Sequence, residues 1–120
     1  MSGGADGPLR ETAMSVRRPL AAVLLAFLAT PAVADPAQLE LGKRVFTELA
    51  EPRCGACHTL ADAGTKGELG PVLDTLKPSA SRVATAVSNG IGVMPAFEDL
   101  SEEQVKAVAV YVQTVTGGKE

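Results

Sequence analysis

Five consecutive residues carry most of the chemistry in this sequence: Cys54-Gly55-Ala56-Cys57-His58. Positions three and four apart share one face of a helical turn, so the two thiols and the imidazole are expected side by side. Two thiols so placed can form thioethers along one edge of a haem while the imidazole binds its iron, and C-x-x-C-H is the attachment pattern of c-type haem. We therefore predict one haem c, tethered by both cysteines and ligated by the histidine.

Three other interpretations compete for the cysteine pair. A thioredoxin-type dithiol is expected in a βαβ context, which the sequence does not show. A zinc site needs four ligands, and the chain has only these two cysteines and a single histidine. A structural disulfide would leave the adjacent histidine unexplained. Haem attachment is the interpretation that uses all three side chains.

A second axial ligand would decide whether the iron is open to small molecules. Beyond residue 34, His58 is the only histidine and Met94 the only methionine, so ligation by two histidines of one chain is excluded. Met94 lies in the segment GIGVMP, whose glycines let backbone approach a flat cofactor and whose proline stiffens the loop. A lone methionine is otherwise a gap-filling core residue. We predict that Met94 is the sixth ligand, which favours ferrous iron and outer-sphere electron transfer.

The N-terminal part is typical of a secretory signal peptide. Arg17 and Arg18 precede an apolar run at 20–28, and small residues follow up to Ala34, where cleavage is expected. The run is shorter than the roughly 20 apolar residues of a membrane span, although an uncleaved anchor is the alternative. Met14 is a candidate true start, because glycine and acidic residues precede it where a signal peptide is positively charged. We predict a signal peptide over residues 1–34, export to the periplasm and no stable membrane anchor.

Residues 35–120 remain after this cleavage and suffice for one domain. They contain twelve Asp and Glu against eight Lys and Arg, with no basic cluster that would favour nucleic acid as a partner. A chain of this length buries a modest core, which a large apolar cofactor would enlarge.

Helix signals stand at both ends of this domain. Asp35-Pro36 predicts an N-cap with proline in the first turn, and this first helix should end before Pro52. Ser101 and Gln104 form a capping box for a last helix that ends at Gly117-Gly118. The last helix is rich in valine, a mediocre helix former, so it must be stabilised by burial.

The middle of the domain offers one further helix. It is expected within residues 76–89, after Pro78 and before Gly90. The stretches 60–73 and 90–100 are rich in glycine and proline and are predicted to be loops. No strand is required anywhere, so the predicted fold class is all-α.

The motifs together resemble those of the small class I c-type cytochromes. The resemblance covers nearly all of residues 35–120 and adds Gly70-Pro71 and Met94-Pro95 to the haem motif. It implies an all-α domain wrapped around one covalent haem, an electron carrier rather than an enzyme. It also implies that the Pro71 carbonyl accepts a hydrogen bond from the free nitrogen of His58, which fixes the tautomer and orientation of the ring.

In this family the first and last helices cross at a contact between glycine and aromatic residues. The matching residues here are Gly42, Phe46 and Tyr111. A carrier of this kind is expected to meet its redox partner through a mainly apolar rim, here Arg53, Ala56, Val93, Pro95 and Ala96.

A narrower resemblance links the sequence to the cytochrome subunits and electron acceptors of bacterial sulfite dehydrogenases. Those proteins take electrons, originally from sulfite, off a molybdenum subunit in the periplasm. The alternatives are a general respiratory carrier that delivers to a terminal oxidase or another cytochrome, and a haem sensor or peroxide-reactive protein with a labile Met94. The matching segments are Arg53-Cys54, 58–64, 70–74, Arg82-Val83 and 94–97.

Overall fold

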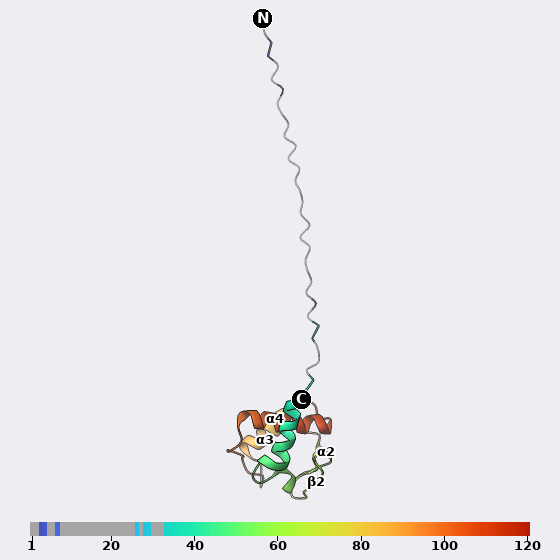
Figure 1. The fold of residues 1–120 in the computed structure, drawn as a ribbon, viewed down its shortest axis with the longest axis vertical. Coiled ribbons are helices and arrows are strands. Elements are labelled where there is room, and N and C mark those ends of the chain that lie inside the picture. The colour runs from blue at the N-terminus through green and yellow to red at the C-terminus, as the bar shows by residue number, and fades with distance from the viewer. Residues whose placement is uncertain (1–2, 5–6, 8–25, 27, 30–32) are drawn as a thin grey trace. The chain divides into compact units, whose positions relative to one another are not determined.

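A computed structural model describes residues 33–120, together with positions 3–4, 7, 26 and 28–29. The predicted signal peptide over residues 1–34 therefore lies for the most part outside the described residues. The domain is a bundle of short helices joined by loops, with one small hairpin (Figure 1). Within the described part of the chain, no helix has the length and apolar character needed to cross a membrane.

The first helix, α1, spans Pro36–Arg44. Its predicted start is confirmed, because the side chain of Asp35 accepts a hydrogen bond from the Ala37 amide at 3.0 Å. The helical path continues through one π-helical turn, η1, over Val45–Leu49 and stops there, before Pro52 as expected. A π-turn is wider than an α-turn, so it changes the direction in which the last residues point.

The last helix, α4, spans Glu102–Thr116. The predicted capping box is present: Ser101 Oγ accepts from the Gln104 amide at 3.2 Å, and Gln104 Oε1 accepts from the Ser101 amide at 2.9 Å. Gly117 ends the helix in the left-handed conformation, with φ of 72°. Several valines and alanines of α4 are buried, which supplies the stability that valine does not give a helix by itself.

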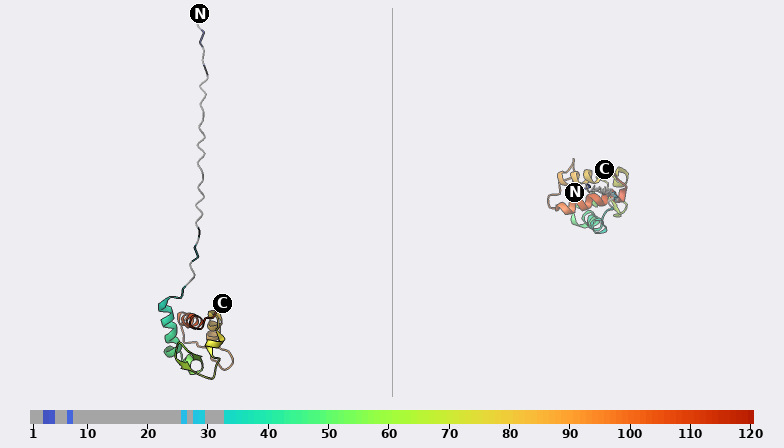
Figure 2. Two further views of the ribbon diagram at one scale, coloured as in Figure 1. Left: turned by 90° about the vertical axis from the view of Figure 1, so that its right-hand side faces the viewer. Right: turned by 90° about the horizontal axis from the view of Figure 1, so that it is seen from above.

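The two end helices cross, as the resemblance implies. Figure 1 shows α1 running across α4, and the turned view in Figure 2 agrees. A Cβ atom on Gly42 would lie 2.2 Å from the Ala107 carbonyl oxygen and 2.5 Å from Tyr111 Cβ, so only glycine permits this approach. The rings of Phe46 and Tyr111 meet edge to face beside the crossing, with centroids 6.3 Å apart.

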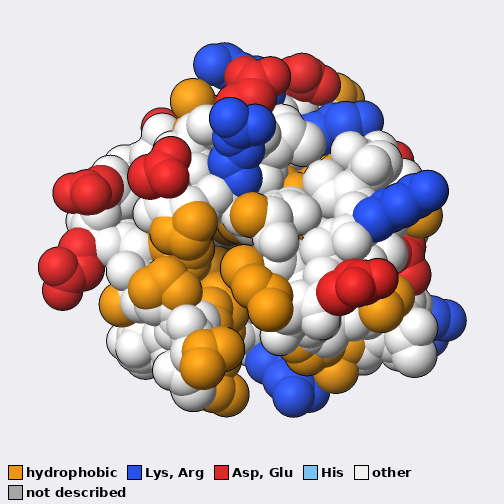
Figure 3. Space-filling view, turned by 90° about the horizontal axis from the view of Figure 1, so that it is seen from below, with side chains coloured by type: hydrophobic (Ala, Val, Ile, Leu, Met, Phe, Trp, Pro, Cys, Tyr) orange, Lys and Arg blue, Asp and Glu red, His pale blue; other side chains and the backbone are white. Residues whose placement is uncertain are grey.

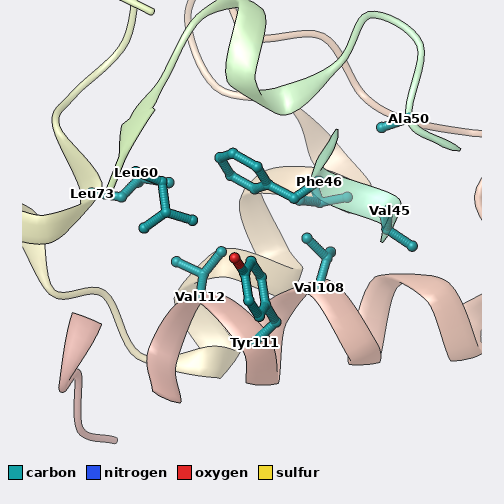
Figure 4. Packing of buried hydrophobic residues seen from close by; sticks show 9 residues of the cluster. Val45, Phe46, Ala50, Leu60, Leu73, Val108, Tyr111 and Val112 are labelled. Carbon is teal, nitrogen blue, oxygen red and sulfur yellow. The ribbon is translucent and has the colours of Figure 1, made fainter. Parts of the chain in front are cut away.

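The hydrophobic core gathers around this crossing. Side chains of η1 and α4 face each other, and residues from the hairpin and from α2 close one side (Figure 4). Cys54, Met94 and Phe97 are partly buried against the same cluster. The buried members are Val45, Phe46, Ala50, Leu60, Leu73, Val87, Val108, Tyr111 and Val112.

Two helices occupy the middle of the domain, where one was predicted. The short α2, Leu73–Leu76, ends at Lys77 in the left-handed conformation with φ of 47°. The helix α3, Ala80–Asn89, begins with Ser79 as N-cap and ends at Gly90, as expected. The prediction therefore had the end of α3 right but missed α2, because a single helical turn has no periodicity to detect.

The sequence did not require a strand, and the stretch 60–73 was predicted to be a loop, but one short hairpin forms there. Strand β1, Thr59–Leu60, pairs antiparallel with β2, Thr65–Lys66. The turn between them includes Gly64 with φ of 67°, a conformation that suits glycine. Each strand has only two residues, so the chain remains in the all-α class.

Candidate haem site

The C-x-x-C-H segment folds as a tight turn against the core. Residues Cys54–Ala56 form the expected helical turn, which is of the 3₁₀ type, η2. The Cys54 carbonyl oxygen accepts from the amides of both Cys57 and His58, at 3.2 and 2.9 Å. This shared acceptor keeps the two cysteines and the histidine on one compact turn.

The two cysteines do not form a disulfide, and both are half-buried. Cys54 packs against the hydrophobic core, and this burial raises the pKa of its thiol to about 11. A thiol in such surroundings is neutral at physiological pH and can be covered by apolar surface without the cost of burying a charge.

His58 is anchored through one ring nitrogen. Its Nδ1 lies 2.8 Å from the Pro71 carbonyl oxygen, an acceptor, so this nitrogen carries the proton and donates it. The other nitrogen, Nε2, is then left with a lone pair that can bind a metal. The half-buried ring is therefore oriented by the chain in the manner of metal-ligating histidines.

Glycines let the chain pass close to this histidine. A Cβ atom on Gly70 would lie 2.5 Å from Cε1 and 2.8 Å from Nδ1 of the His58 ring. The Gly70 amide also donates to the Cys57 carbonyl at 2.8 Å. A Cβ atom on Gly67 would lie 2.4 Å from the Cys57 carbonyl carbon, a close approach that the sequence did not reveal.

The hairpin after His58 holds the backbone of the attachment turn. The Thr65 hydroxyl donates to the His58 carbonyl at 2.9 Å and accepts from the Leu60 amide at 3.2 Å. The Ala61 amide donates to a carboxylate oxygen of Asp74 at 3.0 Å. These contacts join residues 5 to 13 positions apart and depend on the fold of the hairpin and of α2, so the sequence pattern did not predict them.

Met94 lies in a tight turn of its own. Its amide and carbonyl bond to the carbonyl and amide of Ile91, at 3.0 and 3.1 Å. Gly92 has φ of 56°, which favours glycine, and a Cβ atom on Gly90 would lie 2.8 Å from the Met94 carbonyl oxygen, which leaves no room for a side chain there. The Met94 side chain is half-buried against the core cluster that Cys54 also contacts.

Exposed apolar side chains flank both predicted ligands. Leu69 and Val72 stand on either side of Gly70-Pro71, and Val93, beside Met94, is 95% exposed. Figure 3 shows apolar side chains gathered in and around a hollow on one face of the domain, with charged side chains at its margin. Such apolar exposure is unusual unless something covers it.

This set of residues fits a haem. The sequence supplies two thiols and a half-buried thioether, the structure leaves one imidazole nitrogen unbonded, and apolar surface surrounds them. A zinc site fits less well, because no group of three or more His, Cys, Asp or Glu side chains is assembled within the described residues.

Comparisons with known proteins point the same way. Residues 37–112 match the family described as cytochrome C oxidase, cbb3-type, subunit III. Cytochrome c6 from Cyanidium caldarium is 33% identical over 102 residues, covering 78% of this chain and 85% of that protein. The crystal structure of the c-type cytochrome SorU from Sinorhizobium meliloti is similar with a TM-score of 0.68 and 57% identity, over 70% of this chain and 97% of that chain. The chain therefore belongs to this family of small c-type cytochromes, a membership that implies a covalently bound haem c.

Proposed function

We propose that this cytochrome carries single electrons in the periplasm by outer-sphere transfer. Cys54 and Cys57 would tether one haem, and His58 and Met94 would be its axial ligands. The proposal rests mainly on the hydrogen bond from His58 Nδ1 to the Pro71 carbonyl, because this bond leaves the other ring nitrogen, Nε2, available to bind iron. When bound, the haem supplies a one-electron ferric/ferrous couple.

The chain's own residues determine how that couple is used. The Pro71 carbonyl and the closely packed Gly70 hold the His58 ring in one orientation, so the ring would be kept in place as a ligand in both oxidation states. The Met94 thioether would serve as the second protein ligand of the iron, and a thioether favours the ferrous state, which would place the reduction potential toward the high end of the haem range. Neither residue leaves a site where a substrate could bind.

The predicted rim is available for contact with a redox partner. Arg53 and Ala56 on the attachment turn, and Val93, Pro95 and Ala96 beside Met94, are all exposed. A mainly apolar patch with one cation suits a small, transient interface of the kind that electron-transfer proteins use. Arg53 is the obvious charge for steering a partner, and its effect should be mainly on the rate of association.

The donor that we propose is the molybdenum subunit of a sulfite dehydrogenase. The proposal rests on the resemblance of the segments Arg53-Cys54, 58–64, 70–74, Arg82-Val83 and 94–97 to the cytochromes of those systems. The 57% identity to SorU supports the function of a small c-type cytochrome. Oxidation of sulfite to sulfate releases two electrons, so two molecules of a one-haem carrier would be reduced for each sulfite consumed.

A second candidate follows from the family match. The family is described as a subunit of a cbb3-type cytochrome c oxidase, and this description favours delivery of electrons to a terminal oxidase. The two candidates differ in donor and acceptor and share the same haem chemistry. A carrier could also connect both, taking electrons from one partner and giving them to the other.

Optical spectra test the haem chemistry. The purified holoprotein should show the sulfur-to-iron charge-transfer band in its ferric form and no spectral change when carbon monoxide is added to its ferrous form. Rapid carbon monoxide binding would mean that Met94 is labile or is not a ligand, and would favour the sensor or peroxide-reactive alternative.

Stopped-flow reduction tests the partner. A trace of sulfite dehydrogenase plus sulfite should reduce the ferric cytochrome quickly, and Arg53→Glu should slow the bimolecular step, most clearly at low salt. Arg44→Glu is the matched control, because Arg44 is an exposed arginine on α1 that pairs with Glu48. Failure with sulfite, together with fast exchange with a terminal oxidase, would replace the first partner by the second.

A further inference from the structure

The hydroxyl of a core tyrosine reaches out of the core to the hairpin. The Tyr111 ring is only 2% exposed and packs on Phe46 at the crossing of α1 and α4. Its hydroxyl donates to Asp62 Oδ2 at 2.5 Å. Asp62 lies in the turn between β1 and β2, 49 residues before Tyr111 in the sequence. One hydrogen bond thus joins the last helix to the hairpin that follows the haem motif.

A third residue completes this contact. Lys43 Nζ on α1 lies 3.5 Å from the same Asp62 oxygen. The Tyr111 hydroxyl, and to a smaller extent Lys43, holds the pKa of Asp62 below its ordinary value. Burial and the neighbouring carboxylate raise the pKa of Tyr111. Near neutral pH the pair is therefore a neutral donor and a charged acceptor, the strong form of hydrogen bond.

The hairpin transmits this constraint to the haem motif. Strand β1 begins at Thr59, the residue directly after His58. The Thr65 hydroxyl in β2 bonds the His58 carbonyl, so a displacement of the hairpin displaces the His58 backbone. The ring of His58 is held from another segment, by the Pro71 carbonyl. The length of that hydrogen bond therefore depends on where the hairpin sits.

We propose that Tyr111, Asp62 and Lys43 form a brace that fixes the β1–β2 hairpin to the α1–α4 crossing and thereby positions His58 against the Pro71 carbonyl. Tyr111 and Asp62 are then positioning residues for the axial ligand. The inference rests on the proposed function in so far as His58 ligates the iron. If the brace loosens, the hydrogen bond at Nδ1 weakens, the imidazole becomes a poorer donor, and ferric iron loses more stabilisation than ferrous iron.

Tyr111→Phe in the holoprotein tests the brace, because it removes one hydroxyl and keeps the ring and the net charge. Two results are expected. Hydrogen–deuterium exchange of the Leu60 and Ala61 amides should become about tenfold faster relative to that of amides in α4, because Tyr111→Phe removes a hydrogen bond to a charged acceptor. The reduction potential should rise. Lys43→Gln should speed the same amide exchange by a smaller factor, and Arg44→Gln, which breaks a neighbouring exposed pair with Glu48, should leave that exchange unchanged. Both substitutions remove a positive charge, which by itself lowers the potential, so the exchange rates are compared for these two variants.

A double variant separates the brace from a simple charge effect. Asp62→Ala also raises the reduction potential by removing a negative charge, so the shift in this variant alone does not distinguish a brace from a charge effect. With a brace, Tyr111→Phe/Asp62→Ala should shift the potential no further than Asp62→Ala alone, since the hydroxyl no longer has a partner. Additive shifts would overturn the proposal.

Tyr111→Phe could also lower the melting temperature while leaving the reduction potential and the relative amide exchange at the hairpin unchanged. That result would overturn the brace and make Tyr111 a purely structural residue. The wild-type spectra identify the axial ligands before any variant is made. A wrong ligand assignment is thereby detected separately from a failed brace.

Discussion

The two segments that carry the predicted axial ligands are built differently. His58 sits among long-range contacts: its ring bonds Pro71, its carbonyl accepts from Thr65, and Gly70 packs on its imidazole. Met94 depends on a local turn, closed by two backbone hydrogen bonds to Ile91 three residues away. The backbone and ring of His58 are fixed by contacts with other segments, whereas the backbone at Met94 is fixed mainly by its own loop and only the Met94 side chain packs against the core.

This difference assigns different roles to the two ligands. A ligand that several elements hold can leave its position only when those elements also move, whereas a ligand on a short exposed loop can leave by local opening. Gly92 and Val93 in that loop are exposed, and Val93 almost completely so. We therefore expect His58 to be the permanent ligand and Met94 the one that stress displaces first.

The largest effect should come from removing the covalent tether beside His58. Replacing Cys54 and Cys57 together by Ala should abolish the folded holoprotein, because the core around the haem would lose its largest apolar component. Acid-acetone extraction and mass measurement check this: wild-type protein should retain its haem, with a mass equal to the chain from about Asp35 plus haem. Haem that can be extracted from the wild-type protein would contradict the covalent tether.

Met94→Ala should have the next largest effect and should spare the His58 segment. We expect the haem to stay attached, the ferric charge-transfer band to disappear, the reduction potential to fall and the ferrous form to bind carbon monoxide. Optical titration measures all of these. Unchanged spectra would mean that another group ligates the iron, for which Lys77 and the amine of the processed N-terminus are the candidates.

Two glycine substitutions compare the segments directly. Gly70→Ala puts a Cβ atom 2.5 Å from the His58 ring, so we expect a loss of about 1–3 kcal/mol in unfolding free energy together with altered haem spectra. Gly92→Ala meets no atom within 4 Å and costs only the left-handed backbone, about 1 kcal/mol. Denaturant unfolding measures the loss of unfolding free energy in each variant, and the charge-transfer band reports the change at the haem. Equal sensitivity at the two sites would remove the distinction between the segments.

The smallest effect concerns pH and the link between Asp62 and Tyr111. Because the folded pKa of Asp62 is lowered from 3.8, its stabilisation is present above that value and is lost as the pH falls through the folded pKa. Because the folded pKa of Tyr111 is raised from 10.0, its contribution is present below that value and is lost as the pH rises further. Tyr111→Phe should reduce both pH dependences of the unfolding free energy, which urea titrations at several pH values would measure. Curves parallel to wild type would contradict the link.

Local signals in the sequence predicted much of the fold. Asp35, Ser101 and Gly117 mark helix ends through their own side chains or backbone, and such ends are encoded within a few residues. The two-residue strands and α2 were missed because neither is long enough to show a period. The turn at Cys54 was expected to be helical, and only the structure showed that it is 3₁₀, since the spacing of side chains suits either type.

The sequence by itself determined the chemistry. A C-x-x-C-H segment predicts a covalently attached haem, and a domain with one histidine and one methionine leaves a single pair of axial ligands to predict. Only the tertiary structure decided how those ligands are held. The close approach of Gly67 to Cys57, and the bond from Tyr111 to Asp62, join residues that are distant along the chain. Bonding atoms can be read from residue types, but their orientation depends on contacts that exist only after the chain has folded.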